Sequence, residues 1–182
     1  RRDSDWEFGT NPCSEIILRP YQFCNLTEVV VRATDDIESL SRKVRLATIL
    51  GTIQSTYTKF PYLRKVWQRN TEEERLLGVS LTGIMDNPLM TTANKGLEKT
   101  LETLRKLAVD TNTLWADRLG IPASAAITCV KPSGTVSQLV DSASGIHARH
   151  SKYYIRTVRG DNKDPLTEFM KDQGVPSEPD VM

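Results

Sequence analysis

A loop near the start of the chain carries three side chains with complementary chemistry. The stretch "NPCSE" places Asn11, Cys13 and Glu15 at every second position. In an extended loop, alternate side chains point to the same side, so an amide, a sulfur and a carboxylate would face one small ligand. The amide donates and accepts hydrogen bonds, the carboxylate can take a hydroxyl proton, and the sulfur can attack or exchange hydrogen. The trio suits a polar substrate with adjacent hydroxyl groups; the alternative is that Cys13 is an incidental loop thiol.

A second thiol, Cys24, follows eleven positions later at the head of an apolar run. If the loop folds back, Cys13 and Cys24 would approach the same cavity. A thiol that serves as a redox partner must face that cavity in an exchange-competent form. The alternative is that Cys24 is a small buried hydrophobic residue, which is the usual fate of a free cysteine.

The turn "KPSGTVS", residues 131–137, follows a predicted buried strand and opens a short helix. Gly134 would let the backbone approach a ligand closely, and Ser133 and Thr135 could meet phosphate oxygens together with backbone N–H groups. The pattern of a P-loop is absent. The alternative is a capped strand-to-helix turn that binds nothing.

A metal site is not expected. His147 and His150 have the spacing H-x-x-H, but zinc would need further ligands, and Cys13 and Cys24 lie too far apart in sequence for a structural zinc pair. We interpret both histidines as polar loop residues and Cys129 as a core residue.

Strands and helices alternate along the chain. Residues 1–20 are predicted to be a long loop, since glycine, asparagine and proline surround a short apolar patch. Apolar and β-branched runs predict strands at 21–32, 76–84, 125–131 and 153–159, the first with a buried run at 29–31. Helices are predicted at 35–60, about 92–119 and 164–174, with short ones within 62–75 and after residue 134. The apolar face of the first helix is expected to contain Ile37, Leu40, Val44, Ala47, Leu50, Ile53 and Tyr57, and that of the second Leu97, Leu101, Leu104, Ala108 and Trp115. This alternation predicts an α/β fold with a parallel sheet or barrel.

Composition excludes several classes of protein. The 24 basic and 23 acidic residues nearly cancel, which argues against a nucleic-acid or anionic-membrane partner. No apolar stretch approaches the ~20 residues of a spanning helix, and no leader peptide is recognisable. Three cysteines do not form a disulfide framework, so we expect a reducing, cytoplasmic location. The chain has the length of one domain, and since it opens on Arg1 without methionine we expect it to be a fragment.

Taken in order, these motifs resemble the catalytic barrel of ribonucleotide reductase. The resemblance rests on "NPCSE", on Cys24 in "QFCNLTEVV", on "GVSLTGIMDNP", and on "KPSGTVSQL" followed by "GIHARHSKYYIR", and it runs from Phe8 to Arg159. The proline after Asn11 and the short distance between the two cysteines are similar to the class II enzymes, which use adenosylcobalamin. The resemblance implies that residues 1–182 are the second half of a ten-stranded α/β barrel, with a central finger loop at 9–20 and a phosphate-binding turn at 131–137.

The resemblance also implies a role for each site residue. Cys13 would become a thiyl radical that abstracts the ribose 3′ hydrogen, Glu15 would take the 3′-hydroxyl proton, and Asn11 would bind the ribose hydroxyls. Cys24 would be one of two thiols that supply reducing equivalents as the 2′-hydroxyl leaves as water. The substrate phosphates would be held by Ser133, Gly134 and Thr135.

The implied function is reduction of ribonucleoside triphosphates or diphosphates to deoxyribonucleotides, with adenosylcobalamin as cofactor and a thioredoxin-type reductant. The second redox thiol has no counterpart here, so the missing half of the barrel is expected upstream in the same protein or in trans. Two alternatives stay open: a non-catalytic nucleotide-binding or assembly piece of a split reductase, and a Cys/His hydrolase, which would need a base near Cys13.

Overall fold

A computed structural model describes residues 2–91 and 95–180 of the chain. These residues divide into two compact units, one up to Arg149 and one from His150 onward. The first contains strands β1 (Gly9–Thr10), β2 (Ile17–Leu18), β3 (Asn25–Val30) and β4 (Leu77–Thr82), helices α1 (Ile37–Gln54), α2 (Lys65–Glu74), α3 (Lys95–Leu119) and α4 (Thr135–Leu139), and a 3₁₀ turn at Ile84–Asp86. The second contains helix α5 (Pro165–Asp172).

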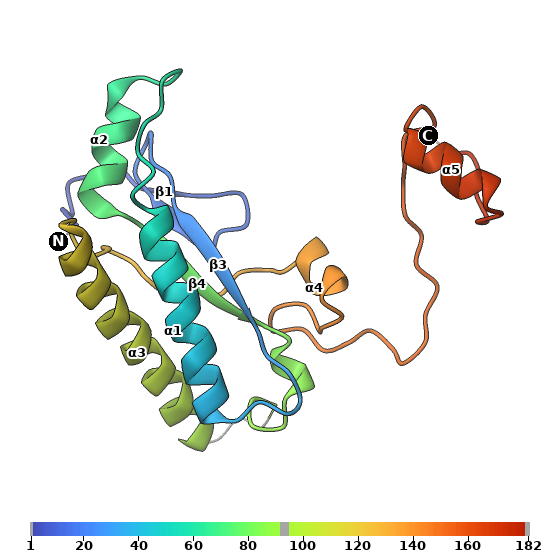
Figure 1. Cartoon of the computed structure of the whole chain (residues 1–182), viewed down its shortest axis with the longest axis horizontal. Coiled ribbons are helices and arrows are strands. Elements are labelled where there is room, and N and C mark those ends of the chain that lie inside the picture. The colour runs from blue at the N-terminus through green and yellow to red at the C-terminus, as the bar shows by residue number, and fades with distance from the viewer. Residues whose placement is uncertain (1, 92–94, 181–182) are drawn as a thin grey trace. The chain divides into compact units, whose positions relative to one another are not determined.

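The centre of the first unit is a parallel pair of strands. β3 and β4 pair from Asn25↔Leu77 to Val30↔Thr82, and α1, α2 and the intervening turns form the crossover between them (Figure 1). The segment 126–129 runs parallel to β4, as shown by the hydrogen bonds from Val79 N to Ile127 O (2.8 Å) and from Cys129 N to Val79 O (3.1 Å). The α/β class and the parallel pairing predicted from sequence are therefore confirmed. The ten-stranded barrel stays a prediction, because the described residues form only this part of a sheet.

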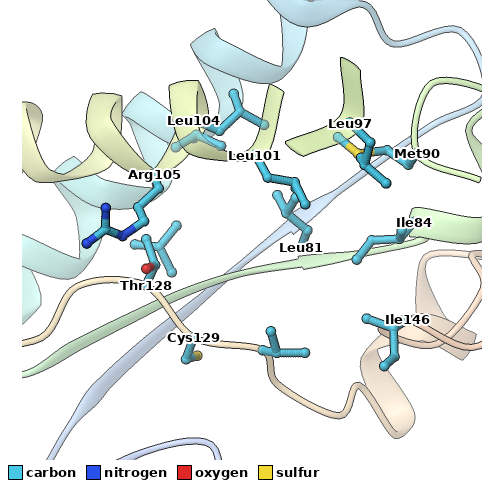
Figure 2. Close-up of a pocket in the computed structure, with 13 residues that line it drawn as sticks. Leu81, Ile84, Met90, Leu97, Leu101, Leu104, Arg105, Thr128, Cys129 and Ile146 are labelled. Carbon is cyan, nitrogen blue, oxygen red and sulfur yellow. The ribbon is translucent and has the colours of Figure 1, made fainter. Parts of the chain in front are cut away.

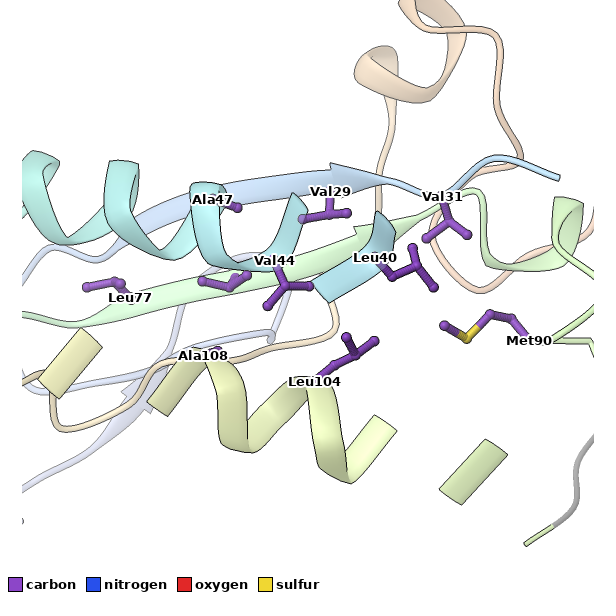
Figure 3. Packing of buried hydrophobic residues seen from close by; sticks show 10 residues of the cluster. Val29, Val31, Leu40, Val44, Ala47, Leu77, Met90, Leu104 and Ala108 are labelled. Carbon is purple, nitrogen blue, oxygen red and sulfur yellow. The ribbon is translucent and has the colours of Figure 1, made fainter. Parts of the chain in front are cut away.

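Two long helices, α1 and α3, lie side by side against one face of this pair (Figure 1). The hydrophobic core lies between them and the strands, as Figure 3 shows. Its buried members are Val29, Val31, Leu40, Val44, Ala47, Leu77, Val79, Met90, Leu104 and Ala108. Because strand side chains alternate, the odd-numbered residues of β3 face the helices and the even-numbered ones face the opposite side, where the candidate site lies.

Part of the predicted face of α1 is wrong. Leu40, Val44 and Ala47 are buried as predicted, but Leu50 is 63% exposed and Tyr57 74% exposed. Thr48, Gly51 and Thr52 occupy the contact instead. A Cβ added at Gly51 would come within 3.1 Å of Leu77 Cδ2, so the close approach of α1 to β4 requires a small residue that a search for apolar periodicity overlooks. The helix also ends at Gln54, before the predicted end near Pro61.

The strand predicted at 153–159 is also wrong. These residues have no regular secondary structure, and Tyr153, Ile155 and Val158 are each at least 78% exposed. An extended apolar segment becomes a strand only when it pairs with a neighbour, and none of the described residues pairs with this one. The helices predicted at 62–75, 92–119 and 164–174 are confirmed as α2, α3 and α5, although residues 92–94 lie outside the described residues.

Candidate active site

The loop that carries Asn11, Cys13 and Glu15 is a β-hairpin. β1 and β2 pair antiparallel through Gly9↔Leu18 and Thr10↔Ile17. The chain reverses at residues 11–14, where Ser14 N donates to Asn11 O (2.9 Å) and Ser14 has a left-handed φ of 59°. The extended conformation predicted for this stretch is therefore wrong. A tight turn presents Cys13 at the exposed tip of the hairpin.

The turn places the side chains of Asn11, Cys13 and Glu15 in different surroundings. Asn11 Oδ1 accepts a hydrogen bond from Ile16 N (3.2 Å), so this amide helps to close the turn. Cys13 is exposed, whereas the side chain of Glu15 is 0% exposed. The sequence motif thus yields an accessible sulfur above a buried carboxylate.

Glu15 is held by a residue from the far end of the unit. Lys131 Nζ donates to Glu15 Oε1 at 3.1 Å, and no described residue donates a hydrogen bond to the other oxygen, Oε2. Burial by itself raises the pKa of Glu15, but the nearby polar groups of its own backbone N–H and of the Asn11 amide, together with Lys131, outweigh burial and lower that pKa below its ordinary value. Glu15 is therefore a buried, ionised carboxylate with one free oxygen.

Cys24 lies beside this ion pair. Its side chain is half-buried at the start of β3, and it has the even-numbered parity of the face opposite the helices. Burial, and next the charge of Glu15, raise the pKa of Cys24. Both Cys24 and Glu15 thus belong to one cluster, and the Cys24 sulfur is held as a neutral thiol.

Two further charged residues complete the cluster, and no sequence motif assigned either of them a role. Glu28 projects from β3 next to Ser133; burial raises its pKa, while Ser133 and then Lys131 partly offset this effect. Lys131 is the other residue, and its backbone N–H donates to Ser80 Oγ at 3.1 Å. The available signal for Glu28 was a lone carboxylate inside the apolar run "NLTEVVV", which is costly unless the carboxylate has a purpose or a partner.

Cys129 is not the core residue that the sequence predicted. It is half-buried, and its sulfur lies so near Gly78 that a Cβ added there would be 2.9 Å away. Burial, followed by the charge of Glu15, raises the pKa of Cys129 to about 11. This thiol is therefore a poor nucleophile at neutral pH.

Close packing brings the hairpin onto the strands. The same added Cβ at Gly78 would lie 3.0 Å from Ile16 Cδ1 and 2.4 Å from Leu26 Cδ2. Ile16 is 3% exposed, so it inserts between the hairpin and β4. Gly78 thus allows the backbone approach that places the hairpin over Cys24 and Glu28.

The base of the hairpin is clamped by buried charges. Glu74, at the end of α2, pairs with Arg2 (3.1 Å) and Arg19 (3.7 Å), and Gln22 Nε2 donates to it at 2.5 Å. The guanidinium of Arg19 also stacks over Trp6, 4.0 Å from the ring centroid. These contacts join both strands of the hairpin region to α2.

The predicted phosphate turn leads into α4, a single helical turn. Gly134 and Thr135 are exposed, whereas Ser133 is 2% exposed and lies beside Glu28. The loop that follows α4 is fixed by Arg149, which pairs with Asp86 (2.9 Å) and Asp141 (2.8 Å). The turn therefore has exposed backbone at Gly134 and Thr135 on a well-anchored loop.

An apolar cavity of about 520 Å³ has Cys129 in its lining, as Figure 2 shows. It lies on the side of the strands that faces the helices, between α3 and residues 128–130. Its lining is Val44, Val79, Leu81, Ile84, Met90, Leu97, Leu101, Leu104, Arg105, Thr128, Cys129, Val130 and Ile146. Asn11, Cys13 and Glu15 are not among these residues.

Neither a metal site nor a Cys/His pair is found in the described part of the chain. Within residues 2–91 and 95–180, no three or more His, Cys, Asp and Glu side chains are grouped to hold a metal ion. His147 is exposed, and His150 makes an edge contact with the ring of Tyr154.

No helix among the described residues has the length and apolar character to span a membrane.

Comparison with known proteins agrees with the resemblance seen in the sequence. The chain is 32% identical to the adenosylcobalamin-dependent ribonucleoside-triphosphate reductase of Lactobacillus gasseri, over 95% of this chain and 26% of that protein. It is 30% identical to a probable enzyme of the same name in Dictyostelium discoideum, over 94% of this chain and 22% of that protein. No protein-family model matches the chain.

A solved structure also matches. The crystal structure of a B12-dependent, class II ribonucleotide reductase superposes with a TM-score of 0.75 and 28% identity, covering 97% of this chain and 28% of the other. The chain spans about a quarter of the length of the curated relatives it matches. In sequence and in fold, this chain is therefore homologous to a quarter-length segment of the class II, adenosylcobalamin-dependent ribonucleotide reductases.

Proposed function

We propose that this chain supplies the radical cysteine and the base of an enzyme that reduces ribonucleotides to 2′-deoxyribonucleotides, the precursors of DNA. The observation that carries the proposal is the hairpin, which presents Cys13 at its tip and buries Glu15 against Lys131, beside Cys24. The names of the relatives and of the matching structure support the same chemistry.

The residues divide the reaction as follows. A thiyl radical on Cys13 takes the 3′ hydrogen atom, and Glu15 Oε2 accepts the proton of the 3′ hydroxyl. The 2′ hydroxyl leaves as water, and Cys24 with a second thiol outside this chain is oxidised to a disulfide. The hydrogen atom then returns from Cys13 to C3′. One ribonucleotide and two thiols thus give one deoxyribonucleotide, one disulfide and one water, while Asn11 binds the ribose hydroxyls.

The exposure of Cys13 fits a cofactor that approaches the sulfur from outside this chain. Adenosylcobalamin, when bound, supplies the radical that starts the reaction. The protein contributes position and shielding: the hairpin fixes the sulfur, and the buried ion pair keeps the base in place. No residue of this chain is assigned as a cobalamin contact.

The substrate in this proposal is a ribonucleoside triphosphate, after the names of the relatives. Its phosphates would meet Thr135 and the backbone N–H groups of Ser133, Gly134 and Thr135. The Ser133 hydroxyl is buried next to Glu28, so we assign phosphate binding chiefly to the exposed Gly134 and Thr135. Binding energy at the phosphates would hold the ribose against Cys13.

Residues 1–182 act in this proposal as part of one catalytic barrel domain. The remaining barrel, with the partner of Cys24, is fused upstream or supplied in trans. A thioredoxin-type protein would re-reduce the disulfide, which places the enzyme in a reducing compartment such as the cytoplasm. The 182 residues alone should therefore form no deoxyribonucleotide.

Replacement of Cys13 tests the proposal in the complete reductase. Cys13→Ser should reduce formation of deoxyribonucleotide below detection, with adenosylcobalamin and a dithiol present, but leave nucleotide binding within about twofold, because serine cannot carry the radical. The matched control is Cys129→Ser, which changes a thiol that has no role here and should retain activity. Appreciable product from Cys13→Ser would remove Cys13 from the radical step.

A further inference from the structure

One charged group stands between the two parts of the candidate site. Lys131 is the last residue before the turn 132–135, and its ammonium group reaches the base of the hairpin, where Nζ lies 3.1 Å from Glu15 Oε1. Residues 15 and 131 are 116 positions apart, so this contact joins the start of the phosphate turn to the loop that carries Cys13. No sequence motif predicted this contact between Lys131 and Glu15.

The backbone that carries this ammonium group is fixed in place. The backbone N–H of Lys131 donates to Ser80 Oγ on β4, and a Cβ added at Gly145 would come within 3.1 Å of Lys131 O. The lysine side chain is 27% exposed, whereas the carboxylate that it contacts is fully buried. A cation on an anchored strand end thus determines where a buried anion can lie.

The other oxygen of Glu15 is left free. Oε2 is buried and accepts no hydrogen bond from the described residues. An unpaired, buried carboxylate oxygen is costly, so it persists only if something else, such as a substrate hydroxyl, satisfies it. Because Lys131 occupies Oε1 alone, the ion pair presents Oε2 to a ligand.

Titratable groups from several elements surround the ion pair of Glu15 and Lys131. The titratable side chains that interact electrostatically with Glu15 or Lys131 are Cys13 on the hairpin, Cys24 just before β3, Glu28 on β3 and Cys129 on the segment beside β4. Lys131 is the one cation among them. Without it, none of these groups would compensate the charge of Glu15.

We propose that Lys131 is the positioning residue of this site: it holds Glu15 as an ionised base, in one orientation, with Oε2 available to the ribose hydroxyl. The inference rests on the proposed function, since it assigns to Lys131 a role through Glu15. It also couples the base to the phosphate turn, because any ligand that moves the turn moves residue 131. The carboxylate would then be aligned by the same segment that holds the substrate.

The first test measures the carboxyl group directly in the 182-residue chain. The ¹³C resonance of the Glu15 carboxyl is assigned by its loss in Glu15→Gln, and its titration is followed by NMR. Lys131→Met should move the titration midpoint of Glu15 to higher pH, because the neutralising cation is gone. Lys131→Arg should restore a midpoint near that of the wild type, and Lys106→Met, at an exposed lysine of α3, should leave it unchanged.

The second test measures turnover by the complete reductase. Lys131→Met should lower kcat/KM about ten- to hundredfold at pH 6, and the loss should shrink as the pH rises and Glu15 ionises. Lys131→Arg should recover most of the rate. If circular dichroism shows that Lys131→Met does not fold, Lys131→Gln replaces it, with the same loss of kcat/KM expected.

The outcomes separate this inference from the proposed function. An unmoved Glu15 midpoint in folded Lys131→Met would overturn the inference, and so would a moved midpoint with an unchanged pH profile of kcat/KM. Full activity of Glu15→Gln would instead overturn the proposed role of the base. The NMR result stands in either case, because it does not depend on catalysis.

Discussion

At the scale of single residues, two carboxylates in one cluster are driven in opposite directions. Glu15 pairs with Lys131, and its pKa lies below the ordinary value, while Glu28 has no direct ion-pair partner among the described residues, and burial raises its pKa. Groups whose environments push their pKa values apart are typical of sites that move protons. Here the difference marks Glu15 as the more readily ionised of the two carboxyl groups.

Because the pKa values of Glu15 and Glu28 shift in opposite directions, replacing each carboxylate should change stability in opposite directions. Folding lowers the pKa of Glu15, so its ionised form stabilises the fold above the unfolded-state pKa, and this contribution is lost as the pH falls through the folded value. Folding raises the pKa of Glu28, so its ionised form opposes folding, increasingly as the pH rises from the unfolded towards the folded value. At pH 8, Glu15→Gln should therefore lower Tm, and Glu28→Gln should leave it equal or raise it.

Thermal unfolding from pH 3 to pH 8 measures both effects. The Glu28 difference should diminish as the pH falls below the unfolded-state pKa, and the Glu15 difference as the pH falls through its lowered folded value. Each variant is the control for the other, since both replace a carboxylate by an amide in the same cluster. Two variants with the same sign of the Tm change at pH 8 would contradict the assigned directions.

At the scale of elements, the hairpin depends on an anchor that lies outside it. Its strands contribute only the pairs Gly9↔Leu18 and Thr10↔Ile17, and an isolated two-stranded hairpin is marginally stable in water. Ile16, packed at Gly78, and the buried Glu74 supply the remaining contacts. The position of Cys13 is therefore determined by α2 and β4 as much as by the loop sequence.

Glu74 provides a prediction at this scale. Its side chain is 2% exposed, pairs with both Arg2 and Arg19 and accepts from Gln22, so Glu74→Gln would remove the buried anion that these three side chains share. We expect a loss of about 3–5 kcal/mol in the free energy of unfolding, measured with urea. Glu73→Gln is the matched control, because Glu73 is 48% exposed and its pair with Arg19 should contribute about 0–1 kcal/mol. Equal losses in the two variants would show that burial does not decide the strength of this clamp.

Sequence patterns predicted the elements better than their contacts. The strands at 25–30 and 77–82 and the long helices were predictable because apolar periodicity reports which residues leave water. The contact face of α1 was only half predictable, because Gly51 packs by its small size, which periodicity does not register. The segment 153–159 was misassigned because its pattern fits a strand whether or not a partner is present.

In the candidate site, too, sequence patterns predicted the residues better than their tertiary contacts. Asn11, Cys13 and Glu15 were found from their spacing, since three reactive types at alternate positions are conspicuous. Lys131 was not given a role, because a contact across 116 positions depends on how β4 and the segment beside it align. Local motifs thus predicted the candidate reacting groups, and only the tertiary structure brought Lys131 into contact with one of them.

At the scale of the whole molecule, the two units differ in how much they bury. Every member of the hydrophobic core lies between Val29 and Ala108, within the first unit. In the described part of the second unit, residues 150–180, no residue is buried, and the apolar side chains of α5, Leu166, Phe169 and Met170, are 43–65% exposed. The first unit therefore contains what a cooperative fold requires, whereas the second contributes no core of its own.

A chain shortened to residues 1–149 tests this division. It keeps Arg149 and its pairs with Asp86 and Asp141, and so keeps the anchor of the loop after α4. We expect its Tm to stay within about 4 °C of the full chain, which corresponds to roughly 1 kcal/mol for a protein of this size. Adding Arg149→Ala to the shortened chain is the informative second variant, because it removes two ion pairs that hold the loop. A fall in Tm of more than about 10 °C on shortening alone would mean that residues 150–182 stabilise the core, and the hairpin of the candidate site could then not be studied without them.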